Sequence, residues 1–413
     1  MEKFPISFWE YMSIENFSVA YVDDWADCGM TIGMSPGFQL IPEHISKVRQ
    51  ILDAAAKRGI KVMIQPARPD LSNTTQFEKN IREHIQNVVK YFGDHEAVFG
   101  VFLSDEPKKG AERLYKLMRT WREEVPHWQP FINLLPWHFT LQELVGFPTW
   151  AEYLDDYCQK ANPPFISFDC YYQMNPGRMG EEIYFTNLKE YSSASIRNKI
   201  PFWVTLMCCP HFEYRYPTED ELRWQMNTAL AWGARGIMWF HFSQRGAGGS
   251  FQNYRYAPIN EFGERTQTYI SLSNVNRHLL AGEGIVLNKL QFKQAYCMEM
   301  NYAWGGFPVL DPGWRVQAVN SDCPMIISEF KHPDGSDYIA LTNMSRTQNA
   351  HPTFAVAGKN PDLLVVGSGG TEVSVQHGGA GIGVRSKGKD FIAVHQYFAP
   401  GQMYLFRVVD AKS

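Results

Sequence analysis

The sequence predicts an α/β protein, a (β/α)8 TIM barrel followed by a C-terminal all-β sandwich domain, and three observations lead to this fold class. Short apolar segments alternate with amphipathic ones over the first two-thirds of the 413 residues, which is typical of repeated strand–helix units. Eight such units follow one another, the number found in a closed parallel barrel. After about residue 284 the helical spacing stops, and short alternating segments are separated by Pro and Gly clusters. We therefore expect the barrel in residues 1–283 and the sandwich in residues 284–413.

The eight predicted strands are short and apolar, and they leave room for a helix between each pair. In chain order they are 4–12, 30–34, 61–65, 98–104, 131–135, 165–168, 202–208 and 236–242. An open, doubly wound sheet is the alternative fold. That fold calls for a glycine-rich phosphate turn after the first strand, and residues 8–11 contain no glycine. The pattern therefore favours the barrel.

The predicted helices carry apolar residues at helical spacing. The helix that begins at Pro42 is an example, because Val48, Ile51 and Leu52 lie on one face and Gly59 follows as a typical C-terminal residue. The other predicted helices are 14–28, 77–91, 111–124, 185–195, 219–231 and 264–280. The alternating segments 337–341, 371–376, 391–395 and 402–408 predict strands of the sandwich domain.

The composition argues against several classes of partner. A net charge of −4 gives no electrostatic reason to bind nucleic acid or an anionic membrane. No segment approaches the roughly 20 apolar residues of a membrane-spanning helix. The chain is rich in aromatic residues, with 12 Trp, 20 Tyr and 27 Phe. Most of them belong in a core, and the surplus suits a site that stacks rings against the apolar faces of sugars.

The seven cysteines are scattered, and their odd number leaves at least one unpaired. Several lie in apolar strands, where a free cysteine behaves as a small hydrophobic residue, so we expect no disulfide framework. Their spacing is unlike that of zinc sites, and we expect no metal or other cofactor. The opening residues enter the first strand without a signal peptide. The protein is therefore expected in the cytoplasm, or in the periplasm or medium if a leader has been removed. Nothing in the sequence predicts an oligomeric state.

Barrel enzymes place their active sites at the carboxyl ends of the strands, and Glu106 ends the fourth. Strict alternation would place Gly100, Phe102, Ser104 and Glu106 toward the barrel axis, and Phe99, Val101 and Leu103 toward the helices. A glutamate half withdrawn from water has a raised pKa, which suits a general acid near neutral pH. The alternative is a helix cap or an ion pair with Lys108 or Lys109. We predict the catalytic role.

The sixth strand ends in Asp169, which alternation places on the inner face together with Phe165 and Ser167. Four roles stay open for Asp169. It could bind a sugar hydroxyl, orient a catalytic partner, supply a second carboxylate, or form a structural hydrogen bond at the barrel rim.

Further polar and aromatic residues lie at or near the strand ends and are expected to contact a substrate or to cap loops. They are Glu10, Gln65, Arg68, Asp105, Asn133, Tyr171, His211, Trp239 and His241. For Trp239 the alternatives are a sugar-stacking platform and a core residue. Cys209 and His211 are residue types found in metal sites and, for cysteine, among nucleophiles. No third ligand or catalytic partner follows at a recognisable spacing, and we predict no metal.

Several segments of the barrel resemble those of known enzymes. The segment 95–107, which ends in Ser104-Asp105-Glu106-Pro107, resembles the strand-four region of clan A glycoside hydrolases. It is most similar to barrel domains that are like family 42 β-galactosidases. Residues 165–171 are similar to the sixth strand of these enzymes, 201–203 and 216–223 to the seventh unit, and 231–237 to the start of the eighth strand. The resemblance covers the whole barrel, and such enzymes often add a C-terminal β-domain.

The resemblance implies an acid/base glutamate at the end of strand four, usually after asparagine. Glu106 matches this position but follows Asp105. It also implies a nucleophilic glutamate at the end of strand seven, where residues 204–209 contain no carboxylate. Three alternatives stay open. Glu213 folds back from the next loop, Asp169 or Glu10 supplies the second carboxylate, or the barrel binds glycan without cleaving it. We predict a glycoside hydrolase that cleaves O-glycosidic bonds of an oligo- or polysaccharide with Glu106 as the acid.

Overall fold

The computed structural model describes residues 3–72, 76–175, 178–244, 253–298, 313–377 and 383–410. The chain forms two compact units. The barrel unit comprises residues 5–216 and 236–273, and the C-terminal unit comprises 217–235 and 274–413 together with the first four residues. The expected domain boundary after residue 283 stays a prediction.

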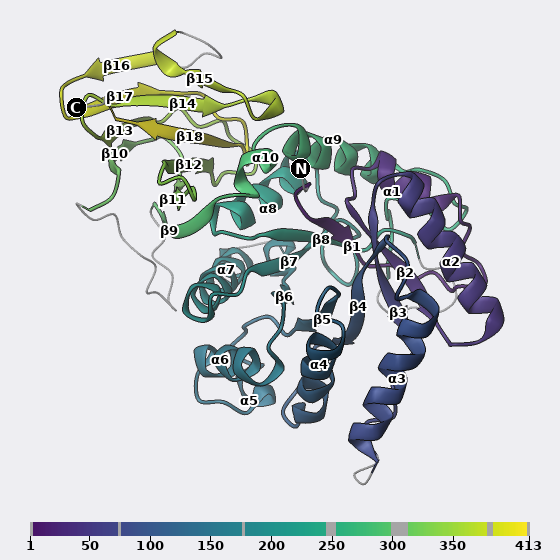
Figure 1. Ribbon diagram of the computed structural model, residues 1–413. Helices are drawn as coiled ribbons and strands as arrows, with labels where there is room; N and C mark the ends of the chain where they lie inside the picture. The colour runs from purple at the N-terminus through teal and green to yellow at the C-terminus, as the bar shows by residue number, and fades with distance from the viewer. Residues whose placement is uncertain are drawn as a thin grey trace. The chain divides into compact units, whose positions relative to one another are not determined.

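The barrel unit contains eight parallel strands in the order β1-β8-β7-β6-β5-β4-β3-β2 (Figure 1). Their bounds are β1 Ile6–Phe8, β2 Ile32–Phe38, β3 Lys61–Pro66, β4 Val98–Asp105, β5 Gln129–Leu134, β6 Ile166–Asp169, β7 Phe202–Met207 and β8 Gly236–Phe240. The two end strands of this order also meet, because the N–H of Thr31, just before β2, donates to the carbonyl oxygen of Ile6 in β1 at 2.9 Å. The predicted barrel is confirmed.

Helices follow the strands, as the periodicity predicts. They are α1 Tyr21–Asp27, α2 Pro42–Lys57, α3 Phe77–Phe92, α4 Glu112–Glu124, α5 Gln142–Val145, α6 Trp150–Ala161, α7 Arg178–Asn198, α8 Glu219–Ala231 and α9 Gln267–Ala281, with a short 3-10 turn η1 at Tyr172–Met174. Helix α8 lies in the C-terminal unit. In the described part of the chain, none of the helices has the length and apolarity needed to cross a membrane.

Aromatic rings fill the barrel interior. The Trp9 ring lies 5.1 Å from that of Phe102, edge to face, and its Nε1 donates to Thr205 Oγ1 at 3.3 Å. Phe165 stacks on Trp203 with 4.2 Å between ring centroids. The Trp203 ring occupies the space where any side chain at Gly236 would begin, since a Cβ there would lie 2.3 Å from it. These rings close the interior below the strand ends, so the barrel is a packed core.

The prediction that Phe99 faces the helices is wrong. Its ring lies 5.8 Å from that of Trp203 on β7, which β4 can reach only across the barrel interior. The physical reason is that the register of β4 shifts twice, against β3 near Gly100 and against β5 between Phe102 and Ser104. Each irregularity breaks the strict alternation of side chains. After the second one, Asp105 pairs with Asn133 of β5.

The C-terminal unit contains two antiparallel sheets, which confirms the predicted β-sandwich. One has the order β10-β13-β17-β16 and the other β15-β14-β18-β12-β11-β9. Their bounds are β9 Gln291–Cys297, β10 Val316–Asn320, β11 Met325–Lys331, β12 Asp337–Asn343, β13 Thr353–Ala357, β14 Asp362–Val366, β15 Glu372–Ser374, β16 Gly383–Lys387, β17 Phe391–His395 and β18 Met403–Val409, and a short helix α10 at Gly284–Leu287 precedes them. Buried side chains of both sheets, such as Ile327 and Phe354, form one core.

Candidate active site

Three neighbouring strands bring carboxyl groups together at the carboxyl end of the barrel. Asn133 at the end of β5 pairs with Asp105 of β4 on one side and with Ser167 of β6 on the other. Its Nδ2 donates to Asp105 Oδ1 at 3.0 Å and to Asp169 Oδ1 at 2.7 Å. Ser167 Oγ donates to Asn133 Oδ1 at 3.1 Å, which fixes the orientation of the amide. Buried Asn133 thus bridges two of the predicted site carboxylates.

Glu106 stands directly beside this bridge. Its N–H donates to the carbonyl oxygen of Asn133 at 2.9 Å, and its φ of 45° lies in the left-handed region. That conformation costs a non-glycine residue about 1–2 kcal/mol, and such strain is often found at functional sites. Pro107 then ends the strand. We call Asp105, Glu106 and Asp169 the carboxylate cluster.

The surrounding protein raises the pKa of Glu106 to about 7. Loss of hydration is the main cause, the negative charge of Asp105 adds to it, and Lys108 opposes it. The side chain still reaches solvent, as expected for a group on the wall of a concave surface. At neutral pH a large fraction of Glu106 therefore carries the proton that a general acid needs.

The other two carboxyl groups of the cluster are shifted in the same direction. Burial raises the pKa of Asp169 well above its ordinary value, the charges of Glu106 and Asp105 raise it further, and the hydrogen bond from Asn133 opposes the shift. Burial also raises the pKa of Asp105. Since close like charges disfavour one another, the cluster loses its protons in successive steps that belong to the group as a whole.

A cavity of about 580 Å³ opens beside Asp105 in the barrel unit. It lies at the carboxyl ends of β1 to β4, and the residues that line it include Ser13, Glu15, Phe38, His44, Gln65, Arg68, Phe102 and Ser104. The side chain of Gln65 is fixed, because its Nε2 donates to the carbonyl oxygens of Ser35 and Glu10 at 2.5 and 3.3 Å. Arg68 Nη1 donates to Ser104 Oγ at 3.0 Å. The cavity thus offers amide, guanidinium and hydroxyl groups next to the carboxylate cluster.

Glu10 is buried, and both of its carboxylate oxygens are used within the protein. Oε1 accepts the N–H groups of Tyr11 and Met12 at 2.9 Å each, and Oε2 accepts the hydroxyl of Ser243 at 2.7 Å. Glu10 therefore ties the end of β1 to the segment after β8. Because both oxygens are already occupied by these contacts, they do not favour Glu10 as the second carboxylate.

We predict that Glu10 makes stability depend on pH. Burial raises its pKa from 4.5 to about 7, and the hydrogen bonds oppose this. A carboxyl group whose pKa is higher in the folded state stabilises the fold at low pH and loses that contribution as pH rises to about 7. The full effect is on the order of 3 kcal/mol. Urea unfolding of the wild type and Glu10→Gln at pH 5 and pH 8 checks this. Between pH 5 and pH 8 the free energy of unfolding should fall less in Glu10→Gln than in the wild type. An equal fall in both proteins would contradict the prediction.

His211 and Tyr171 lie together in a buried aromatic group. Their rings are 5.2 Å apart, and His211 lies 4.8 Å from Phe240. Burial lowers the pKa of His211 to about 4, so the imidazole is neutral at pH 7. Its Nδ1 lies 2.9 Å from the carbonyl oxygen of Cys209. Among the described residues, no group of three His, Cys, Asp or Glu side chains is arranged to hold a metal ion.

The two candidates of the eighth strand expose no surface. Trp239 and His241 are each 0% exposed, so neither side chain can contact a sugar in this structure. The prediction of Trp239 as a stacking platform is therefore wrong, and the alternative, a core residue, is correct. Trp239 alternates along β8 with Phe240, whose ring contacts Tyr171 and His211, and so Trp239 points to the opposite face. The peptide bond between Phe240 and His241 is cis.

Glu213 lies exposed in the loop after β7, next to Phe212, whose φ is 46°. Its negative charge acts on Tyr172 and on His211. The buried strand end before it, Met207-Cys208-Cys209, carries no carboxylate. The role of Glu213 as the second carboxylate stays a prediction.

The sequence reasoning missed three rings in the loops after β5 and β6. His138 stacks between Phe139 and Tyr172, with ring centroids 4.1 and 4.9 Å away. We call these three residues the ring stack. The signal was present, because the aromatic residues come in the loops directly after β5 and β6. The stacking itself depends on how the two loops fold.

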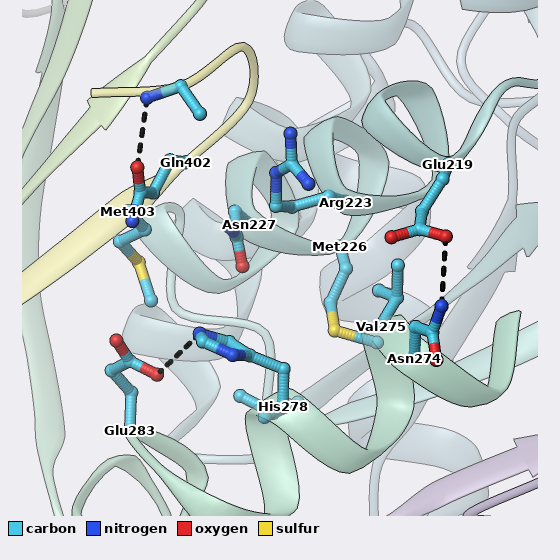
Figure 2. Close-up of a pocket in the computed structure, with 12 residues that line it drawn as sticks. Glu219, Arg223, Met226, Asn227, Asn274, Val275, His278, Glu283, Gln402 and Met403 are labelled. Atoms are coloured by element: carbon cyan, nitrogen blue, oxygen red, sulfur yellow. Dashed lines mark hydrogen bonds and ion pairs between the residues drawn. The ribbon is translucent and has the colours of Figure 1, made fainter. Parts of the chain in front are cut away.

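A second cavity, of about 260 Å³, lies within the C-terminal unit (Figure 2). Its polar side chains largely satisfy one another. Asn274 Nδ2 donates to Glu219 Oε2 at 3.1 Å, and His278 Nε2 lies 3.9 Å from Glu283 Oε2. Figure 2 shows that the two side chains of each pair point toward one another. This cavity is smaller than the barrel cavity, and no residue of the carboxylate cluster lines it, so the barrel cavity is the better candidate for the active site.

No protein-family model matches this chain, and none of the curated protein sequences does. Solved structures with the same fold do match. An α-amylase from H. orenii is 11% identical, with a TM-score of 0.53 over 98% of this chain and 100% of that chain. A glucosidase from Croceicoccus marinus is 10% identical, with a TM-score of 0.47 over 99% and 96% of the two chains. At such identities the similarity to the amylase shows the fold alone.

Proposed function

We propose that this protein is a glycoside hydrolase that cleaves O-glycosidic bonds of an oligo- or polysaccharide. The observation that carries the proposal is the carboxylate cluster bridged by Asn133 at the carboxyl ends of β4 to β6. Glycosidases need two carboxyl groups, of which one protonates the leaving oxygen while the other attacks or activates water. The resemblance of the barrel segments to clan A glycoside hydrolases, and to family 42 among them, agrees with this chemistry. The fold shared with an α-amylase agrees with it as well.

In the proposed reaction, Glu106 gives its proton to the glycosidic oxygen as the bond from that oxygen to the anomeric carbon breaks. Asp169 is the second carboxylate. It either bonds to the anomeric carbon, to be displaced later by water, or takes a proton from the water that attacks that carbon directly. Water is consumed, and both sugars leave with hydroxyl groups. Asn133 is a positioning residue that holds Asp169 and Asp105 in place.

The substrate contacts belong to the cavity. Gln65, Arg68 and Asp105 line it and are proposed to bind sugar hydroxyls. Tyr171 follows Asp169 by two residues and packs against His211.

Hydrolysis of a panel of aryl glycosides and plant or host oligosaccharides tests the proposal, with product anomers followed by NMR. Release of a free sugar by the purified protein supports it. If glycans bind without being cleaved, the alternative of a non-catalytic glycan-binding barrel replaces it.

We predict that kcat/KM falls as pH rises above about 7. The acid must be protonated to donate, and the pKa of Glu106 is raised to about 7. The fall should be tenfold for each pH unit once Glu106 has lost its proton. A pH–rate profile from pH 4 to 9 measures this. Activity that keeps rising to pH 9 would rule out Glu106 as the acid.

A further inference from the structure

The ring stack forms an aromatic surface at the edge of the candidate site. His138 lies nearly parallel to Tyr172, at 11° between ring planes, and at 30° to Phe139. Phe139 is 50% exposed, while Tyr172 is half-buried. Burial lowers the pKa of His138, so its imidazole is uncharged at neutral pH. The stack is therefore an uncharged aromatic surface that ends in an exposed phenylalanine.

Tyr172 is the end of the stack that faces the carboxylate cluster. It follows Asp169 by three residues, in the turn η1 at the end of β6. Burial is the main cause that raises its pKa, and the charges of Cys170, Glu106, Asp169 and Glu213 add to the shift. The stack thus leads outward from the cluster, from Tyr172 through His138 to Phe139.

The cavity and the ring stack come from different groups of neighbouring barrel strands. The cavity is lined by residues at the ends of β1 to β4, up to Asp105. The stack comes from the loops after β5 and β6, the next two strands around the barrel. The carboxylate cluster lies at the ends of β4 and β6, so it belongs to both of these groups of strands.

We propose that the substrate is a glycan of several sugars that extends across the cluster, with one part in the cavity and the other stacked on Tyr172 and Phe139. This inference rests on the proposed function. A pyranose ring has an apolar face of C–H groups, and an aromatic ring buries such a face without needing a charge. The polar cavity instead suits the hydroxyl groups of a sugar. The ring stack therefore selects for chain length, and the enzyme acts on oligosaccharides better than on single-sugar glycosides.

The test compares Phe139→Ala with wild type on an aryl monosaccharide glycoside and on the two- to six-sugar oligosaccharides of the same sugar. Loss of one stacking contact should lower kcat/KM on the longer substrates about tenfold more than on the aryl glycoside, mainly through KM. Tyr172→Leu should already show the loss with the shortest oligosaccharides, because Tyr172 is nearer the cluster. Phe262→Ala, which removes a ring that is 79% exposed and outside the stack and the cavity, is the matched control and should leave all constants unchanged.

Each outcome separates the two proposals. Equal losses by Phe139→Ala on all substrates, or none, would overturn the extended binding surface while the hydrolase assignment stands. If no substrate is cleaved, calorimetric titration of Glu106→Gln with the same six-sugar oligosaccharide decides. If this variant binds the oligosaccharide, and adding Phe139→Ala weakens the binding about tenfold, the ring stack is a glycan-binding surface and the hydrolase proposal is rejected. Absence of binding overturns the inference as well.

Discussion

Replacement of Glu106 by glutamine is expected to lower kcat by about 100- to 10,000-fold, because positioned general acids contribute about that much to the rate. Glutamine has the same shape, so the backbone at φ 45° and the hydrogen bond from its N–H to Asn133 should persist. Substrate binding should therefore change little, and the loss should fall on kcat. The assay is initial-rate kinetics on the best substrate of the glycoside panel.

Two further variants serve as comparisons for Glu106→Gln. Asp169→Asn removes the buried carboxylate that Asn133 contacts, and it should reduce kcat to a similar extent. Glu213→Gln makes the same chemical change at the exposed loop position after β7. If Asp169 is the second carboxylate, Glu213→Gln retains most of the activity. The reverse order of effects would transfer that role to Glu213, and full activity of Glu106→Gln would remove Glu106 from the mechanism.

Replacement of Gly100 by alanine is expected to lower the free energy of unfolding by at least about 3 kcal/mol, the upper part of the range for overpacking. A Cβ at this position would lie 1.9 Å from the carbonyl oxygen of Gln129. That oxygen belongs to the backbone of β5, so no side chain can turn aside to make room. The two strands would have to separate at Gly100 and Gln129, which are paired in the ladder that continues to Asp105 and Asn133.

Gly37→Ala is the matched control, since it adds the same methyl group to another barrel strand, β2. A Cβ on Gly37 meets nothing within 4 Å. Its effect should be within about 1 kcal/mol, as for compatible Gly→Ala changes. Urea unfolding of both variants measures the difference. Equal unfolding midpoints would show that the β4–β5 ladder can relax around the added methyl group.

The order of strands and helices could be read from the sequence because it depends on local periodicity. Two examples are the helix that begins at Pro42 and ends before Gly59, and the strand at 61–65. In both, the spacing of the apolar residues predicts the conformation without information from the rest of the chain. The same reasoning located Glu106, Asn133 and Asp169, since parallel strands of a barrel all end at one face. Their approach to one another follows from the order β4-β5-β6.

Other features depend on contacts between segments that are distant in sequence, and only the tertiary structure decided them. The register shifts of β4 turn Phe99 inward, because strand pairing rather than alternation sets which way a bulged strand faces. The sequence offered Glu10 as a substrate contact or second carboxylate. In the structure, the hydroxyl of Ser243, 233 residues away, donates a hydrogen bond to one of its carboxylate oxygens. Trp239 became core because its face of β8 is fully covered. The ring stack of His138, Phe139 and Tyr172 exists because two loops fold against each other, and no pattern within either loop specifies that contact.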